Sequence, residues 1–251
     1  MSEPHAIPFE SYASSVRDAF DAVNGAAIVE AGQPILLKPN LVNASPFPVT
    51  TSPDFVEAVI KVIRDHTDAS ITVAEGCGSA TMETDAVFAE LGYVGMARRS
   101  GVSLLDLNHA PLVKKSRPEL TIFPEMWLPE VAFTHCIISL PVLKAHSLAT
   151  ITGTLKNMLG FAPPTHYQGG GGWKKSLFHS RMHDSISDLC AYVAPHLTIM
   201  DATVGLAQYH LGGPECDPPV NRILAGTDAM AVDRLAARLL GIDWQQVGHL
   251  R

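Results

Sequence analysis

Short apolar segments that alternate with helical patterns limit the possible folds of this chain more than any other feature of its sequence. Buried strands are predicted at residues 35–38, 70–74, 102–106, 136–140 and 197–201. The segments between the first three have apolar residues that recur at the spacing of a helix. A strand, a helix and a second parallel strand form the right-handed crossover unit of α/β proteins. The predicted fold class is therefore α/β, with a mainly parallel sheet flanked by helices.

Helical patterns and turn signals divide the rest of the chain. Helices are predicted at about residues 9–23, 53–63, 83–99, 150–160, 180–193 and 228–240, and a further strand at 221–225. Ser52 and Pro53 suit the start of the second of these helices. Four prolines interrupt the segment 108–134. We expect a single domain over residues 1–251, with an irregular or β-rich insertion, or a small lobe, at 108–134.

Composition excludes several classes of protein. Hydrophobic residues make up 47% of the 251 residues and charged residues 17%, which allows a large core and argues against disorder. The net charge of −7 argues against a nucleic-acid partner. The first residues lack the basic and apolar regions of a signal peptide, and no apolar run approaches the length of a membrane span. The expected location is therefore cytoplasmic, without a membrane partner.

The four cysteines are scattered along the chain. Cys77, Cys136, Cys190 and Cys216 match neither a CxxC zinc pair nor an iron–sulfur ligand set. No iron–sulfur cluster is therefore expected from this chain. Cys136 and Cys190 lie in apolar runs and are expected in the core. Cys77 lies between glycines, a more reactive setting, although a structural role is favoured there as well.

Polar residues end several of the predicted strands. Lys38, Asp106 and Asp201 are the last residues of their strands, and Glu75 follows another. In open α/β sheets, ligands bind beyond the carboxyl ends of the strands. We therefore expect these side chains around one crevice; the alternative for each is a solvated strand end. A buried lysine at position 38 is costly without an anionic partner.

Two later segments point to the same kind of site. Lys144 and His146 occur in PVLKAH, after a buried strand, and Lys156 and Asn157 occur in TGTLKN. Lysine, histidine, threonine and asparagine side chains together with free backbone N–H groups can form an oxyanion or phosphate cradle. The spacings GxxxxGK[ST] and GxGxxG are absent from the sequence, which argues against ATPase and dinucleotide-binding functions.

These segments predict one lysine-lined pocket. We expect the side-chain nitrogens of Lys38, Lys144 and Lys156 to converge on a cavity that binds a small anion. Asp201 and Asp233 are the expected internal carboxylate partners. Neutral hydrogen bonds are expected from Asn40 and Asn157. The segment 163–172, with two prolines and four consecutive glycines, is predicted to be a mobile loop or a lid over this pocket.

Two further groups complete the candidate site. His179 and His183 are four residues apart and could share one helix face, a spacing that suits a divalent metal. The alternatives are surface polarity or a proton-donating role for one histidine. Asp228 and Asp233 belong to the last predicted helix. Asp228 suits its first turn, whereas Asp233 could pair with a pocket lysine or a surface arginine.

Five motifs resemble those of the domain-of-unknown-function family 362. They occur in the order LLKPNLV, PVLKAH, TGTLKNMLG, IMDAT and ILAGTDAMAVDRLAARLLG, over residues 33–249. The resemblance implies an α/β domain that is sometimes attached to a ferredoxin-like iron–sulfur module, which this chain lacks. It carries no agreed reaction. The motif positions that it supplies are Lys38, Asn40, Lys144, His146, Lys156, Asn157, Asp201 and Asp228.

Two functional hypotheses follow. In the first, the chain is an enzyme of isomerase, lyase or hydrolase type that acts on a small carboxylate or phosphate. The expected catalytic residues are Lys144, His146, His179 and Asp201. The expected ligand-binding residues are Lys38, Asn40, Lys156, Asn157, Asp228 and Asp233. In the second, the chain binds an anionic ligand without catalysis, or is an accessory protein that serves a separate redox protein.

Overall fold

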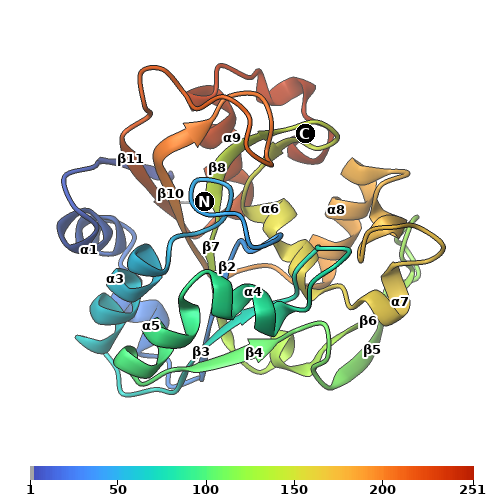
Figure 1. The fold of residues 1–251 in the computed structure, drawn as a ribbon, viewed down its shortest axis with the longest axis horizontal. Helices are drawn as coiled ribbons and strands as arrows, with labels where there is room; N and C mark the ends of the chain where they lie inside the picture. Colours follow the sequence, from blue (N-terminus) through green and yellow to red (C-terminus); the bar gives the residue numbers. More distant parts are fainter. Residues whose placement is uncertain (1–2) are drawn as a thin grey trace.

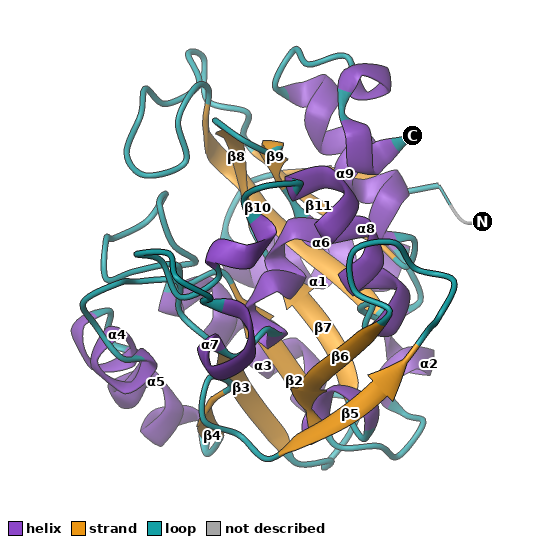
Figure 2. Cartoon of the chain, turned by 90° about the vertical axis from the view of Figure 1, so that its right-hand side faces the viewer, coloured by secondary structure: helices purple, strands orange, loops and turns teal. Residues whose placement is uncertain are grey.

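The computed structural model describes residues 3–251, which form a large sheet with helices on both of its faces (Figures 1 and 2). The nine strands of this sheet are β1 (His5–Pro8), β2 (Ile35–Pro39), β3 (Ile71–Glu75), β4 (Ser103–Asp106), β7 (Cys136–Leu140), β8 (Val142–His146), β9 (Thr150–Thr152), β10 (Leu197–Leu206) and β11 (Arg222–Gly226). Two further strands, β5 (Leu112–Ser116) and β6 (Glu125–Pro129), pair with each other in a small antiparallel sheet. This small sheet confirms the β-rich insertion predicted at 108–134.

The strand order of the large sheet is β1-β11-β10-β7-β2-β3-β4. The five strands from β10 to β4 are parallel to one another, whereas β11 and β1 pair antiparallel at one edge. Strand β8 pairs parallel with the second half of β10, and β9 pairs antiparallel with β8. The predicted α/β fold with a mainly parallel sheet is therefore confirmed, and the strand predicted at 221–225 proves to be antiparallel.

The helices divide between the two faces of the sheet. The first group is α1 (Tyr12–Ala22), α2 (Gly25–Val29), α3 (Pro53–Arg64), α4 (Thr84–Glu90) and α5 (Tyr93–Ser100). The second group is α6 (Thr154–Asn157), α7 (Pro164–Tyr167), α8 (Met182–Tyr192) and α9 (Ala229–Leu239). Short 3₁₀ turns are η1 (Glu130–Phe133), η2 (Met158–Phe161), η3 (Ser176–Phe178), η4 (Trp244–Gln246) and η5 (Gly248–Leu250).

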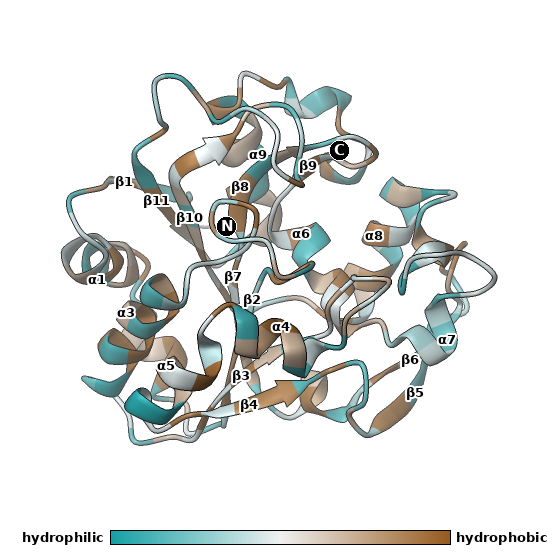
Figure 3. Cartoon of the chain, in the orientation of Figure 1, coloured by the Kyte–Doolittle hydropathy of each residue, from teal (hydrophilic) through white to brown (hydrophobic). Residues whose placement is uncertain are grey.

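Alternate residues of the central strands enter different cores. Ile35 and Leu37 of β2 pack into the core shared with α1, α3, α4 and α5, whereas Leu36 packs into the core shared with α6 and α8. All three side chains are buried because both faces of a parallel sheet are covered by helices. The hydropathy colouring of Figure 3 shows α1 and α3 as mixtures of apolar and polar residues, as expected for helices with one buried face.

Helix boundaries follow local capping. Helix α3 begins as predicted, with the Ser52 hydroxyl accepting a hydrogen bond from Asp54 N and Pro53 in the first turn. Helix α1 begins at Tyr12 rather than residue 9, because Ser11 is its N-cap. The helix predicted at 83–99 is two helices, since Gly92 adopts a φ of 83° between α4 and α5.

The prediction of one helix over residues 150–160 is wrong. Residues 150–152 form β9, and the helical turns α6 and η2 begin only at Thr154. The reason lies in Gly153, where a Cβ atom would collide with the carboxyl group of Asp233. That carboxyl group accepts hydrogen bonds from Thr154 N and Leu155 N, at 2.6 and 2.9 Å, and so fixes the start of α6.

Candidate functional site

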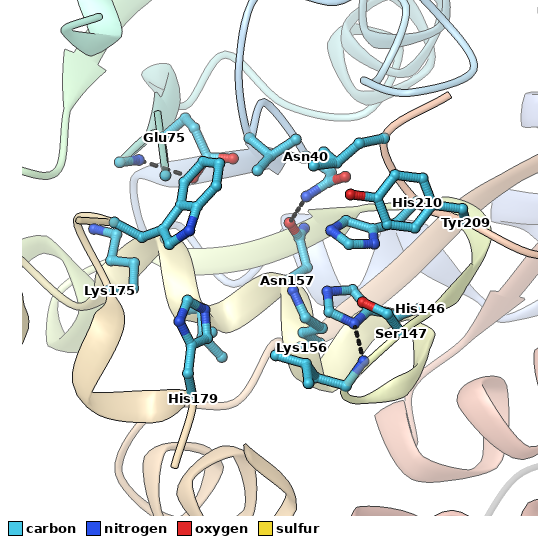
Figure 4. Close-up of a pocket in the computed structure, with 18 residues that line it drawn as sticks. Asn40, Glu75, His146, Ser147, Lys156, Asn157, Lys175, His179, Tyr209 and His210 are labelled. Carbon is cyan, nitrogen blue, oxygen red and sulfur yellow. Dashed lines mark hydrogen bonds between the residues drawn. The ribbon is translucent and has the colours of Figure 1, made fainter. Parts of the chain in front are cut away.

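A cavity of about 260 Å³ lies beyond the carboxyl ends of β2 and β3. Asn40 follows β2, Glu75 ends β3, and both line the cavity. Figure 4 shows His146 and His210 on one side, His179 and Lys175 on the other, and Asn157 between them. The cavity therefore lies at the carboxyl edge of a parallel sheet, where ligands bind in open α/β sheets.

A buried ion pair forms the base of the site. Lys38 Nζ lies 2.7 Å from Glu75 Oε1, and both side chains are almost wholly shielded from solvent. Glu75 also accepts backbone hydrogen bonds from Leu41 N and Gly76 N, each at 2.8 Å. Burial lowers the pKa of Lys38 more than Glu75 raises it. This carboxylate is thus already satisfied by the protein. Gly160 packs against the pair, where a Cβ atom would meet Glu75 Oε1 and the end of Lys38.

Two asparagines connect the lysines. Lys144 Nζ donates to Asn40 Oδ1 at 2.6 Å, and Asn40 Nδ2 donates to Asn157 Oδ1 at 3.4 Å. The same oxygen of Asn157 accepts from Lys38 Nζ at 3.2 Å. The Nδ2 group of Asn157 donates to the Lys38 carbonyl at 2.9 Å and to Ser139 Oγ at 3.1 Å. The hydrogen-bond partners therefore fix the orientation of both amides.

Lys144 lies behind Asn40 and does not line the cavity. Its Nζ also donates to the carbonyl of Val49 at 2.6 Å. Burial, and secondarily the charge of Lys156, lowers the pKa of Lys144 to about 7. Lys38 is likewise one layer behind the cavity wall. The expectation that Lys38, Lys144 and Lys156 all line the pocket thus holds for Lys156 alone, because the two asparagines intervene.

Lys156 reaches the cavity from α6 and is half-buried. Across residues 3–251, no group makes a hydrogen bond or an ion pair with its Nζ. Burial is the main cause that lowers the pKa of Lys156 to about 8, although Glu75 acts in the opposite direction. A half-buried ammonium group without a protein partner is available for an anionic ligand.

Lys175 is a pocket residue that the sequence analysis missed. It is buried, lines the cavity and donates from Nζ to Asn108 Oδ1 and to the Ala162 carbonyl. Burial lowers the pKa of Lys175 to about 7. The glycines just before it predicted a mobile loop rather than a buried side chain. The signal available was the sequence WKK, two lysines that follow Trp173 directly after the glycine run.

Three histidines line the same cavity. His146 Nδ1 accepts hydrogen bonds from Leu148 N and Ala149 N, at 3.0 and 3.1 Å. Because Nδ1 is the acceptor, the neutral ring carries its hydrogen on Nε2. The ring stacks on His210 with centroids 3.7 Å apart. Burial lowers the pKa of His146, of His179 and of His210, the last to about 3. His210 Nδ1 is buried without a partner among the described residues.

None of the four predicted aspartates, Asp106 included, lines the cavity. Asp201 accepts hydrogen bonds from the Tyr12 hydroxyl at 2.6 Å and from the Thr203 hydroxyl at 2.7 Å. Asp233 fixes the start of α6, as described above. Asp228 is the N-cap of α9, where its side chain accepts from Ala231 N at 3.0 Å. The lysine partnership predicted for Asp201 and Asp233 is therefore wrong, because each carboxylate is held by nearer hydrogen-bond donors.

The predicted histidine pair is also separated. His179 precedes α8 and lines the cavity, whereas His183 Nδ1 lies 2.8 Å from His249 Nδ1. The two do not share a helix face, because α8 begins only at Met182. Within residues 3–251, one group of three side chains could ligate a metal, since their ligand atoms lie within 4.8 Å of one another. This group lies outside the cavity. Its members are Glu83, Asp106 and His109.

The segment 163–172 begins with the short helix α7 and ends at the cavity. Trp173 lines the cavity, and Lys174 Nζ donates to Met82 O at 2.6 Å and to Glu83 Oε2 at 2.8 Å. Together with the contacts of Lys175, these bonds anchor the end of the glycine run. Its mobility stays a prediction. Cys77 is fully buried, and burial raises the pKa of its thiol, which favours the structural role.

Comparison with known proteins gives a family and one curated relative. The model of a family described as Domain of unknown function (DUF362) matches residues 35–238. The chain is also similar to the thylakoid-associated protein sll1697 of Synechocystis sp. (strain ATCC 27184 / PCC 6803 / Kazusa). The identity is 26% over 251 residues, and the match covers 93% of this chain and 71% of the relative. In the described part of the chain, no helix combines the length and the apolar character needed to cross a bilayer.

Proposed function

The chain belongs to the DUF362 family, and we propose that its pocket binds a small anionic molecule, a carboxylate or a phosphate, on which the protein acts as an enzyme of isomerase, lyase or hydrolase type. One observation carries the proposal. Lys156 and Lys175 line one cavity and Lys144 lies behind its wall, and across residues 3–251 none of the three has a carboxylate within ion-pairing distance. Among the described residues, Glu75 is the one carboxylate that lines the cavity, and it is already paired with Lys38.

The charges of the side chains around the pocket favour binding of an anion. Each additional protonated lysine makes the local charge more positive, because the Lys38–Glu75 pair is neutral as a unit. Burial of an unpaired ammonium group costs several kcal/mol of hydration, which lowers its pKa instead. The lowered pKa values of Lys144, Lys156 and Lys175 fit this state. A bound anion offsets the cost and returns the lysines to their charged form.

The pocket residues divide into ligand-binding and positioning groups. Lys156 has free donors and is the main anion-binding residue in this proposal. His146 supplies its Nε2–H as a neutral donor, since its Nδ1 is held by two backbone amides. Lys144 is a positioning residue, because it holds Asn40 rather than lining the cavity.

Proton transfer is assigned to His179 and Lys175. His179 lines the cavity and its pKa is lowered by burial, so the ring is neutral and able to accept a proton at neutral pH. Lys175 has a pKa of about 7 in the empty pocket, and the bound anion returns it to the charged form, in which it can donate a proton. Glu75 cannot serve as the base while it is paired with Lys38.

Titration calorimetry with inorganic phosphate and with acetate tests the binding. We expect at least one of these probes to bind the natural chain, and Lys156→Met to abolish the heat while keeping the melting temperature. Lys114→Met is the matched control, because Lys114 is exposed and pairs with Glu125 at 2.7 Å. No binding of either probe, or equal binding by the Lys156 variant, overturns the proposal.

Catalysis needs a separate measurement. Small carboxylates and phosphate esters that bind are followed by proton NMR in D₂O, which detects both hydrogen exchange at carbon and cleavage products. His179→Gln is expected to abolish turnover while binding persists. Binding of every probe without exchange or cleavage contradicts the enzymatic part and favours a non-catalytic ligand-binding protein.

A further inference from the structure

We propose that the ligand of this pocket carries a flat aromatic body attached to its anionic group. The inference rests on the proposed anion site and adds the chemical class of the rest of the molecule. Bare phosphate or acetate would then occupy only the inner part of the cavity. The rim, the wall and the size of the pocket favour such a ligand.

The rim of the pocket is apolar and exposed. Trp173 is 51% exposed, Leu148 51% and Tyr209 44%, and all three line the cavity. In the described chain, six large hydrophobic side chains are exposed, so half of them gather at this opening. They come from three segments that are remote in sequence. Such a gathering marks a surface that is covered when a ligand binds.

The polar groups lie deeper than this rim. Lys175 is 6% exposed and Asn157 is 3% exposed, whereas Trp173 and Tyr209 remain largely open to solvent. A ligand that enters with its charge inward therefore leaves its body between apolar side chains. This order of polarity suits a molecule with one anionic end, and it disfavours a compact anion charged on all sides.

The wall on one side consists of aromatic rings. His146 and His210 are stacked with centroids 3.7 Å apart, and Tyr209 meets His210 edge-to-face at 4.9 Å. Figure 4 shows the three rings together on one side of the pocket. Aromatic rings prefer offset-stacked and edge-to-face neighbours, which a flat aromatic ligand supplies. Trp173 provides a further large ring at the opening.

The size of the cavity agrees with a small organic molecule. Its volume of about 260 Å³ is just below the range of roughly 300–1,000 Å³ typical of drug-sized ligands. A single water molecule takes up about 30 Å³ in the liquid. The cavity is therefore several times larger than a bare anion needs, and it accommodates one ring with its charged substituent.

Matched ligand pairs test the inference on the full chain. Phenyl phosphate is compared with methyl phosphate, and benzoate with acetate, by titration calorimetry, so that each pair differs only in the apolar body. We expect the aromatic member of the pair that binds to be favoured by about tenfold, the order expected for one or two aromatic contacts. Trp173→Ala and Tyr209→Ala should each reduce this preference.

Trp127→Ala is the matched control, since Trp127 is 39% exposed and lies outside the cavity. Trp173→Leu replaces the alanine variant if that variant fails to fold. Equal affinity of the aromatic and aliphatic members, with binding still dependent on Lys156, overturns the inference but leaves the anion site intact. A preference that neither rim variant changes also overturns it. Absence of Lys156-dependent binding for all four probes instead overturns the proposed anion site.

Discussion

Lys38 and Glu75 form a buried ion pair, with Nζ and Oε1 2.7 Å apart at the ends of two adjacent parallel strands. The pair places an already neutralised carboxylate at a cavity whose lining lysines, Lys156 and Lys175, have no carboxylate partner among residues 3–251. Its geometry shows that the charges of Lys38 and Glu75 are neutralised within the protein. Substitution of either partner should therefore affect stability before it affects binding.

Glu75→Gln should lower the free energy of unfolding by about 3–5 kcal/mol, because it leaves Lys38 buried without a counter-charge. Chemical denaturation measures this change. Glu125→Gln, at an exposed ion pair with Lys114, should cost less than about 1 kcal/mol. The double variant Lys38→Met with Glu75→Gln should recover part of the loss. Similar small costs for Glu75→Gln and Glu125→Gln would contradict the structural role of the buried pair.

Gly160→Ala should destabilise the protein by about 1–3 kcal/mol, the usual cost of overpacking. The added methyl group would collide with Glu75 Oε1 and with the end of Lys38. Gly172→Ala is the control, because no atom lies within 4 Å of a Cβ at that position. Thermal melting compares the two variants. Equal melting temperatures would show that the ion pair can move aside.

Anion affinity should fall as the pH rises from about 7 to 9. Burial lowers the pKa of Lys144 and of Lys175 to about 7 and that of Lys156 to about 8, so these groups lose protons in this window. The anion prefers the protonated lysines, raises their pKa values and hence takes up protons on binding. Calorimetry in buffers of different ionisation enthalpy measures this uptake. Affinity that stays constant or rises over this pH range would oppose the assigned lysine role.

Asp228→Ala and Asp233→Ala should separate capping from ligand binding. Loss of the Asp228 cap should cost about 0.5–2 kcal/mol of stability and leave anion binding unchanged. Loss of Asp233 leaves Thr154 N and Leu155 N without their acceptor, at a cost of about 1–3 kcal/mol. That variant should also weaken anion binding, because α6 carries Lys156 and Asn157. Weaker binding in the Asp228 variant alone would restore that aspartate to the site.

Local sequence patterns predicted the sheet and the carboxyl-edge location of the site. Lys38 and Glu75 could be placed there because each ends or follows a short apolar strand, and parallel strands bring their ends to one edge. The same patterns missed β8, since Val142–His146 follows Pro141 and carries two polar residues. They also merged β9 with the following helical turns, because the effect of Asp233 on Gly153 arises from residues 80 positions apart.

Side-chain partnerships were less predictable than strand positions. Asp201 was expected near the lysines, but its partner is Tyr12, 189 residues earlier in the chain. Lys175 was missed because its acceptor Asn108 lies 67 residues away and belongs to another loop. Such pairings depend on how loops pack over the sheet. Composition and periodicity describe single segments and carry no information on this packing.

The cavity wall draws on chain segments that span most of the sequence, from Asn40 through Lys156 and Lys175 to Leu211. Contacts of such long range form late, since loop closure must precede them. During synthesis, the site can therefore be completed only after the residues around His210 have left the ribosome. A ligand that recognises the finished pocket would slow unfolding and leave the rate of folding almost unchanged. Anion binding would then serve as an indicator that the strands and loops up to Leu211 have assembled.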